Sequence, residues 1–241
     1  MQILVISDIH ANLTAFEAVL ADAGPVDAVW CLGDLVGYGP DPEACVERVR
    51  QLPNTLCLLG NHDAAVLGRL DQEAFNHEAN ISVNWTRGQL SPASLGYLQG
   101  LRTRIETQDV TLSHGSPRNP IWEYLLDINT VLSNFSFFKT SICLVGHTHI
   151  PIIYTHNGNG TVEWSIPQPG TRTTIHERAI LNPGSVGQPR DRNPMAAYAL
   201  YHLEEKHWEA RRVEYDIASV QQRIASAGLP FRHAARLVDG W

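Results

Sequence analysis

Short apolar runs recur through residues 1–150 and limit the folds that are open to this chain. They are rich in Val, Ile, Leu and Cys, and each is too short to form an ordinary helix. Runs of this kind are typical of strands that are buried on both faces of a sheet. Helix-like stretches separate the first of them, so the pattern predicts an α/β sandwich. The runs lie at residues 3–6, 28–32, 56–59, 110–112 and 142–145.

A polar residue able to bind a metal follows each of these runs. If the five strands share one sheet, we expect these side chains to meet outside its carboxyl edge, where open α/β sheets bind their ligands. Glycines stand directly before three of them and fit sharp exits from the sheet. The candidate ligands are Asp8, His10, Asp34, Asn61, His114, His147 and His149.

The chemistry of this set favours two transition-metal ions. Imidazole and carboxylate ligands without thiolates suit Mn²⁺, Fe, Co²⁺ or Zn²⁺ and fit Ca²⁺ poorly. The candidates are too many for one tetrahedral zinc ion, but they suit two ions that share a carboxylate. A pair of ions about 3.5–4 Å apart is a recurrent device for displacement at phosphorus.

The order of these residues resembles the calcineurin-like metallophosphoesterases. The family pattern D-x-H, G-D, G-N-H-D/E, x-H and G-H-x-H occurs in full between residues 8 and 149. Residues 33–39 and 182–187 are similar to the small bacterial and archaeal, phosphodiesterase-like branch. The resemblance implies a four-layer αββα sandwich with the metal site at the carboxyl ends of the strands. It also implies two divalent ions, with Mn expected and Fe, Zn, Co or Ni as alternatives.

The resemblance also implies a role for each residue. It assigns one ion to Asp8, His10, Asp34 and His149, and the other to Asp34, Asn61, His114 and His147. His62 becomes the catalytic group that protonates the leaving oxygen. The implied reaction is hydrolysis of a phosphodiester or phosphomonoester, by in-line attack of a hydroxide that bridges the ions.

The sequence departs from the protein phosphatases of this family at two positions. Those enzymes carry an Asp three residues after the bridging Asp, followed by a phosphate-binding Arg, whereas this chain has Gly37 and Tyr38. The loss of an anion-binding Arg favours phosphodiesters, which carry a single charge. Arg190 is a candidate substrate contact, because an Arg after residues 182–187 can bind a phosphate bidentately. A solvated loop position is the alternative for Arg190.

The remaining sequence predicts one domain over residues 1–241. Helices are expected at Leu13–Ala23, after Asp41-Pro42, and from Asp216 to about Ser226. Apolar spacing predicts a helical insertion at about 64–101, broken near Ser91. Residues 197–203 and 207–215 alternate like a hairpin.

Composition and charge limit the classes of binding partner that we expect for this chain. The net charge of −7 and the scattered Lys and Arg offer no basic stripe, so nucleic acid beyond a short phosphodiester is not expected. A signal peptide and a membrane span are not expected, and the four separated cysteines favour a cytoplasmic protein. The expected partner is a small phosphoester substrate, and a homo-oligomer is left open.

Two other functions compete with hydrolysis of a small phosphoester. A non-catalytic scaffold of the same fold is one, although such proteins usually lose ligands or the catalytic His. A nuclease is the other, which the mild acidity of the chain disfavours.

Overall fold

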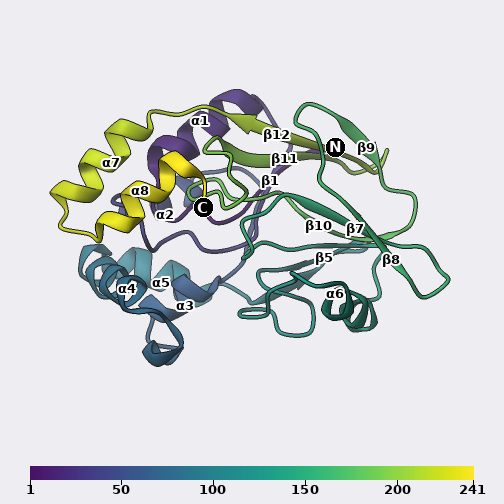
Figure 1. Cartoon of the computed structure of the whole chain (residues 1–241), viewed down its shortest axis with the longest axis horizontal. Helices are drawn as coiled ribbons and strands as arrows, with labels where there is room; N and C mark the ends of the chain where they lie inside the picture. The colour runs from purple at the N-terminus through teal and green to yellow at the C-terminus, as the bar shows by residue number, and fades with distance from the viewer.

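The computed structural model describes residues 1–241, with the side chain of residue 72 outside the description. Two six-stranded sheets pack face to face, and helices cover the outer face of each sheet (Figure 1). The predicted four-layer αββα sandwich is therefore confirmed.

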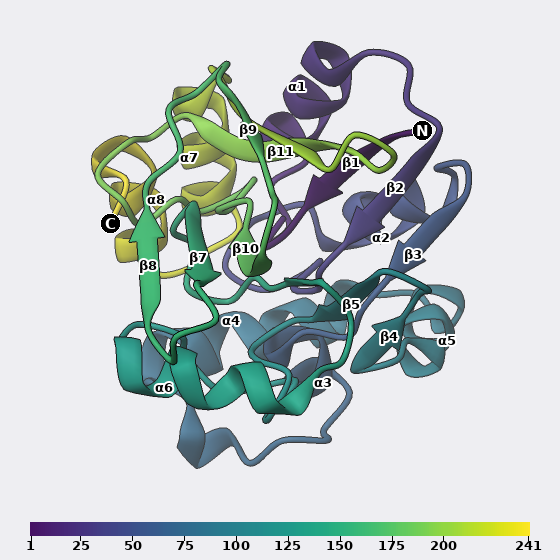
Figure 2. The same ribbon diagram turned by 90° about the vertical axis from the view of Figure 1, so that its right-hand side faces the viewer.

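The first sheet contains the amino-terminal strands. Its parallel part consists of β1 (Gln2–Ile6), β2 (Ala28–Cys31) and β3 (Thr55–Cys57), which lie side by side in Figure 2. The strand order is β3-β2-β1-β11-β12-β9. The antiparallel part consists of β11 (Ala196–His202), β12 (His207–Val213) and β9 (Arg172–Thr174), so the predicted hairpin forms.

The second sheet has the order β4-β5-β6-β10-β7-β8. Three strands are parallel, namely β5 (Val110–Ser113), β6 (Ile142–Leu144) and β10 (Arg178–Asn182). The edges are antiparallel and consist of β4 (Arg104–Glu106), β7 (Ile152–His156) and β8 (Val162–Ser165).

The five ligand-bearing strands do not share one sheet, the condition under which their ends were expected to meet. β1, β2 and β3 belong to the first sheet, whereas β5 and β6 belong to the second. Apolar runs show that a strand is buried on both faces, and this holds equally for strands of two stacked sheets. The candidate site therefore lies at one end of the sandwich, where strands of both sheets end.

Alternate residues of β1 serve two separate cores. Ile3 and Val5 face the second sheet and pack in the core between the sheets, together with Trp208. Leu4 and Ile6 face the opposite way and pack under the helices of the first layer. This division follows from the two-residue period of a strand.

Two helices form most of the outer layer on the first sheet. α1 (Leu13–Ala23) begins where predicted, because the Asn12 side chain accepts a hydrogen bond from the Ala15 N–H at 3.1 Å. α2 (Pro42–Arg50) begins with Pro at its first position, as predicted. The Asp41 carboxylate does not cap it, and instead accepts from the Leu13 N–H and from Arg223.

Helices occupy the region of the expected insertion. They are α3 (Asn61–Val66), a 3₁₀ turn (Gln72–Ala74), α4 (His77–Gln89) and α5 (Pro92–Gly100). Ser91 caps α5 at the predicted break. On the other side of the molecule, α6 (Ile128–Asn134) and a 3₁₀ turn (Phe135–Phe137) cover the second sheet.

The chain ends in a helical hairpin, of which only the first helix was expected. α7 (Ile217–Ser226) begins after Asp216 as predicted, and α8 (Phe231–Asp239) follows after Pro230. The Gly228-Leu229-Pro230 turn indicated a stop, but Pro230 also sits at the start of the next helix. Among the described helices, none has the length and apolar character that a membrane span requires.

Candidate metal centre

Sharp turns at the ends of the strands aim the candidate ligands at one another. Asp8, His10 and Asp34 have φ values of 55°, 47° and 55°, and His147 and His149 have 63° and 62°. Left-handed backbone is uncommon for residues other than glycine and costs about 1–3 kcal/mol each. Such conformations cluster at functional sites, where the surrounding structure enforces them.

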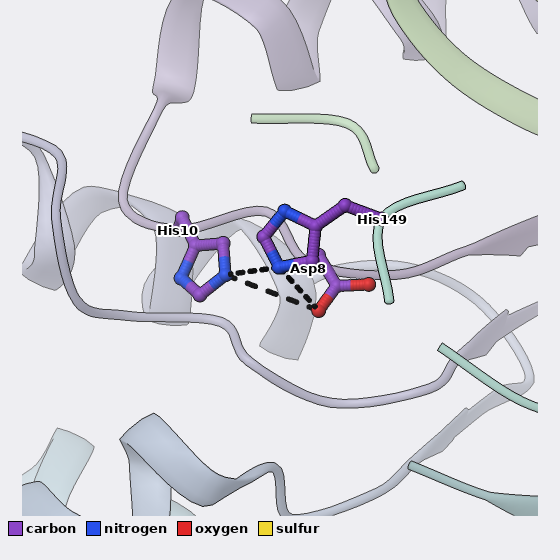
Figure 3. A group of neighbouring side chains, drawn as sticks. All are labelled: Asp8, His10 and His149. Atoms are coloured by element: carbon purple, nitrogen blue, oxygen red, sulfur yellow. Dashed lines mark hydrogen bonds and ion pairs between the residues drawn. The ribbon is translucent and has the colours of Figure 1, made fainter. Parts of the chain in front are cut away.

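Asp8, His10 and His149 form the first group of candidate ligands (Figure 3). Their nearest atoms are Nε2 of His10 and Nε2 of His149, which are 3.2 Å apart. Oδ1 of Asp8 lies 3.3 Å from His149 Nε2 and 3.9 Å from His10 Nε2. The other oxygen of Asp8 accepts a hydrogen bond from the His147 N–H.

Asp34 lies between the two groups. Its Oδ1 accepts from the His62 N–H at 2.8 Å. Its Oδ2 faces Nε2 of His10 at 3.6 Å and Nε2 of His114 at 3.4 Å. One carboxylate oxygen is thus directed at imidazoles of both groups, as a bridging ligand requires.

Asp34, His114 and His147 form the second group. Asn61 belongs beside it, because its Oδ1 lies 3.0 Å from His114 Nε2. The structure therefore brings together all seven residues that the sequence indicated. They come from both sheets, and each is at most 3% exposed.

Backbone carbonyls hold the imidazoles in place. Nδ1 of His10, His114 and His149 faces the carbonyl of Val36, Leu32 and Gln188, respectively. A ring that donates from Nδ1 to a carbonyl keeps Nε2 free as a ligand, the usual arrangement in metal sites. His147 is reversed, because its Nε2 faces the Trp122 carbonyl and leaves Nδ1 toward the site.

Burial and charge set the protonation of these groups. Burial holds the pKa of His10, His147 and His149 well below the usual value, so their rings are neutral and competent as ligands. For Asp34, burial is outweighed by His114 and the other imidazoles, which hold its pKa well below the usual range. Asp34 in turn raises the pKa of His114 to about 9, against the effect of burial.

The site fits a pair of divalent cations. Asp8 Oδ1 and Asp34 Oδ2 are buried, and neither has a hydrogen-bond partner among the described residues. A buried carboxylate oxygen is costly unless a charge or a donor balances it. Both oxygens face imidazole nitrogens, and the mixed N and O donors suit transition metals.

His62 lies beside the cluster on the first turn of α3, with its ring 5.0 Å from the His10 ring and 4.3 Å from the Tyr38 ring. Its Nδ1 is buried and has no hydrogen-bond partner among the described residues. A Cβ added at Gly37 would lie 2.6 Å from that nitrogen. Position 37 therefore adjoins Nδ1, where Gly supplies no orienting carboxylate. Burial lowers the pKa of His62 to about 4.

Asp63 forms a brace that was not predicted from the sequence. The buried carboxylate of Asp63 accepts hydrogen bonds from the N–H groups of Asp34, Val36 and Gly60, at 2.9, 3.1 and 3.0 Å. It thereby joins the loop that carries Asp34 to the start of α3. The only sequence signal was its place in the G-N-H-D motif.

Arg190 lies next to the site. Its backbone N–H donates to the carbonyl of His149, and its guanidinium stands over the Tyr38 ring at 5.8 Å. Burial raises the pKa of Tyr38 and Tyr124, and the Arg190 charge opposes that rise in both. The guanidinium therefore lies near both phenols, and this position suits a substrate contact better than a solvated loop.

Aromatic side chains line the rim of the cluster. Tyr124 stacks on the His147 ring at 3.8 Å and is 43% exposed. Phe75 contacts both His62 and Trp122. This rim was not predicted, because Phe75 lies far along the chain from Trp122 and Tyr124.

A model of the calcineurin-like phosphoesterase superfamily domain matches residues 1–206. The chain resembles the crystal structure of a metallophosphoesterase from Sphaerobacter thermophilus, with a TM-score of 0.93 and 45% identity over 100% of this chain and 99% of that one. The uncharacterized protein MJ0912 of Methanocaldococcus jannaschii is 38% identical over 99% of this chain and 98% of its own. Phosphodiesterase YfcE of Escherichia coli is 25% identical over 83% of this chain and 86% of its own.

Proposed function

Because the chain belongs to the calcineurin-like phosphoesterase superfamily, we propose that it hydrolyses small phosphodiesters with two divalent cations. One observation carries this proposal. Two buried carboxylate oxygens, of Asp8 and Asp34, lack hydrogen-bond partners among the described residues and face the nitrogens of His10, His114 and His149.

The two groups of side chains suggest how the cations are held. Asp8, His10 and His149 would hold one, and Asn61, His114 and His147 the other, with Asp34 shared between them. When bound, two such cations lower the pKa of water toward neutrality and balance charge on the phosphoryl oxygens. Mn²⁺ is the metal that we propose, on the basis of the N and O donor set.

His62 is proposed to donate a proton to the leaving oxygen. Burial keeps its ring neutral near pH 7. An anionic phosphoryl group in contact with the ring would favour the imidazolium and raise its pKa toward the working range. Because no carboxylate orients Nδ1, the ring is held by its contacts with Tyr38 and Phe75.

The surroundings favour diesters over monoesters. Gly37 and Tyr38 stand where the phosphatases of the family have an acid and a phosphate-binding Arg. Burial raises the pKa of Tyr38, so its phenol stays neutral, and a phenol does not supply the positive charge of an Arg. A phosphodiester carries one negative charge and needs less cationic compensation at the metal centre than a phosphomonoester dianion.

The test is hydrolysis of bis-p-nitrophenyl phosphate and of p-nitrophenyl phosphate by protein loaded with Mn²⁺. We expect turnover of both, with the higher kcat/KM for the diester. Metal content must be measured on the same sample. Absence of turnover with both positions filled would contradict the proposed function, whereas faster turnover of the monoester would contradict only the preference for diesters.

A further inference from the structure

The terminal helix α8 contributes a second arginine near the metal centre. α8 lies beyond residue 206, where the match to the superfamily model ends. Figure 1 shows α7 and α8 together on one side of the molecule, next to α4. Nε2 of His233 on α8 faces the Glu78 carbonyl of α4 at 3.3 Å.

Backbone contacts hold the end of α8 against the loop that carries Arg190. The Arg192 N–H donates to the carbonyl of Gly240 at 2.7 Å. Gly240 has a φ of 64°, and a Cβ there would meet the backbone of Asn193 at 2.7 Å. The Arg236 carbonyl accepts from the Gly240 N–H at 2.8 Å, so the last turn of α8 is held against the loop that carries Arg190.

Neither arginine is neutralised by an acid. Within the described residues, no carboxylate lies at ion-pair distance from Arg190 or Arg236, whereas Arg232 pairs with Glu78. Arg190 donates to the neutral Gln188 side chain, and Arg236 stacks on the Trp241 ring at 5.6 Å. The Nε atoms of Arg190 and Arg236 are buried without a hydrogen-bond partner among the described residues.

Tyr38 links the two arginines: the Arg190 guanidinium lies 5.8 Å from its ring, and His233, one turn before Arg236 on α8, lies 4.9 Å from the same ring. Burial lowers the pKa of Arg236, and Arg190 lowers it further. Two partly buried guanidinium groups without an ion-pair partner are unfavourable close together unless an anion is bound there at some stage.

Both arginines lie near Tyr38, and Arg190 also adjoins the metal ligands. The Arg190 N–H donates to the carbonyl of His149, and the Tyr38 ring that its guanidinium faces lies 4.7 Å from the His10 ring and 4.3 Å from the His62 ring. Arg236 acts on Tyr38 and His233. Nδ1 of His233, a side chain that is 2% exposed, is also without a hydrogen-bond partner among the described residues.

We propose, on the basis of the function proposed above, that Arg190 and Arg236 form an anion site beside the metal centre that binds a second phosphate group of the substrate. A phosphate offers several acceptor oxygens, which guanidinium groups bind bidentately. The substrate class is then a phosphodiester that carries a further phosphate, with the scissile group at the metals and the second group at the arginines.

The test measures binding and does not need turnover. Isothermal titration of Mn²⁺-loaded protein compares alkane diphosphonates of increasing chain length with alkylphosphonates of the same lengths. We expect the wild type to bind the best diphosphonate at least about ten-fold more tightly than its monophosphonate, a difference of about 1.4 kcal/mol. Arg236→Gln should reduce that ratio to about two-fold or less, and Arg236→Lys, which keeps the charge but loses the bidentate donors, should give an intermediate ratio.

Arg232→Gln is the matched control. Arg232 lies on the same helix and also stacks on Trp241, but its side chain is 50% exposed and is paired with Glu78. It should keep the wild-type ratio. An unchanged ratio in Arg236→Gln, an equal loss in Arg232→Gln, or no diphosphonate preference in the wild type would overturn the proposed anion site. If the protein has no hydrolytic activity but still prefers diphosphonates in a way that depends on Arg236, the anion site would be supported and the proposed function contradicted.

Discussion

Asp34 has more contacts to other site residues than a single ligand role requires. One oxygen binds the backbone of His62, while the other faces imidazoles of both groups. We therefore predict that Asp34→Asn abolishes metal occupancy at both positions, as measured by metal analysis of the purified variant. His62→Ala is the matched control, since it should keep both metals and lower kcat by about 10²-fold or more. Full occupancy in Asp34→Asn would refute a bridging role.

Asp63 supports the site from behind without facing the cluster. Asp63→Ala would leave three buried N–H groups without their acceptor, at a cost of about 2–4 kcal/mol of unfolding free energy. Urea denaturation measures this loss, and weaker Mn²⁺ binding should accompany it. Glu47→Ala, which removes an exposed acid from α2, should change neither quantity. A loss below about 1 kcal/mol would show that water replaces the carboxylate.

At the level of elements, the sequence predicted the parallel strands and α1 well. Runs such as 3–6 carry their own burial pattern, and Asn12 marks the start of α1 locally. α8 was missed because the signal that ends one helix, Pro230, also begins the next. The sheet to which each strand of the predicted sandwich belongs was not predicted, since no local pattern assigns a strand to one of two stacked sheets. The brace at Asp63 and the rim around Tyr124 depend on long-range contacts and could not be read locally.

The buried His233 on α8 makes the stability of the protein depend on pH. Burial lowers its pKa in the folded protein to about 4, whereas an unfolded His has a pKa of about 6.5. Between these values the unfolded state binds more protons, so the stability that this group contributes is present above about pH 6.5 and is lost as the pH falls toward 4. Across this pH range the contribution of His233 to the free energy of unfolding would fall by on the order of 3 kcal/mol.

We therefore predict that His233→Gln flattens the pH dependence of stability. Urea denaturation at pH 7.5 and pH 5 should show a smaller difference for the variant than for the wild type. His77→Gln replaces an exposed histidine at the start of α4 and should leave the wild-type difference intact. A variant as sensitive to acid as the wild type would assign the effect to other groups.

At the scale of the whole molecule, the cores are linked through shared strands. β1 places Ile3 and Val5 in the core between the sheets and Leu4 and Ile6 in the core under the helices. Because both cores include residues of β1, one core cannot unfold while the other still holds this strand in place. We propose that residues 1–241 form one domain and predict a single cooperative transition. Far-UV and near-UV circular dichroism should give the same midpoint, whereas two separated midpoints would indicate that the helices at 64–101 unfold on their own.

The left-handed turns at the ligands also imply a trade-off between the stability of the protein and its activity. Asp8, His10, Asp34, His147 and His149 all adopt backbone that glycine or asparagine tolerates better. Replacing one of them by glycine would remove a ligand and relieve local strain at the same time. A descendant of this chain that no longer needed its metals would therefore gain stability by losing these ligand residues. Only selection for the reaction keeps these five side chains in place.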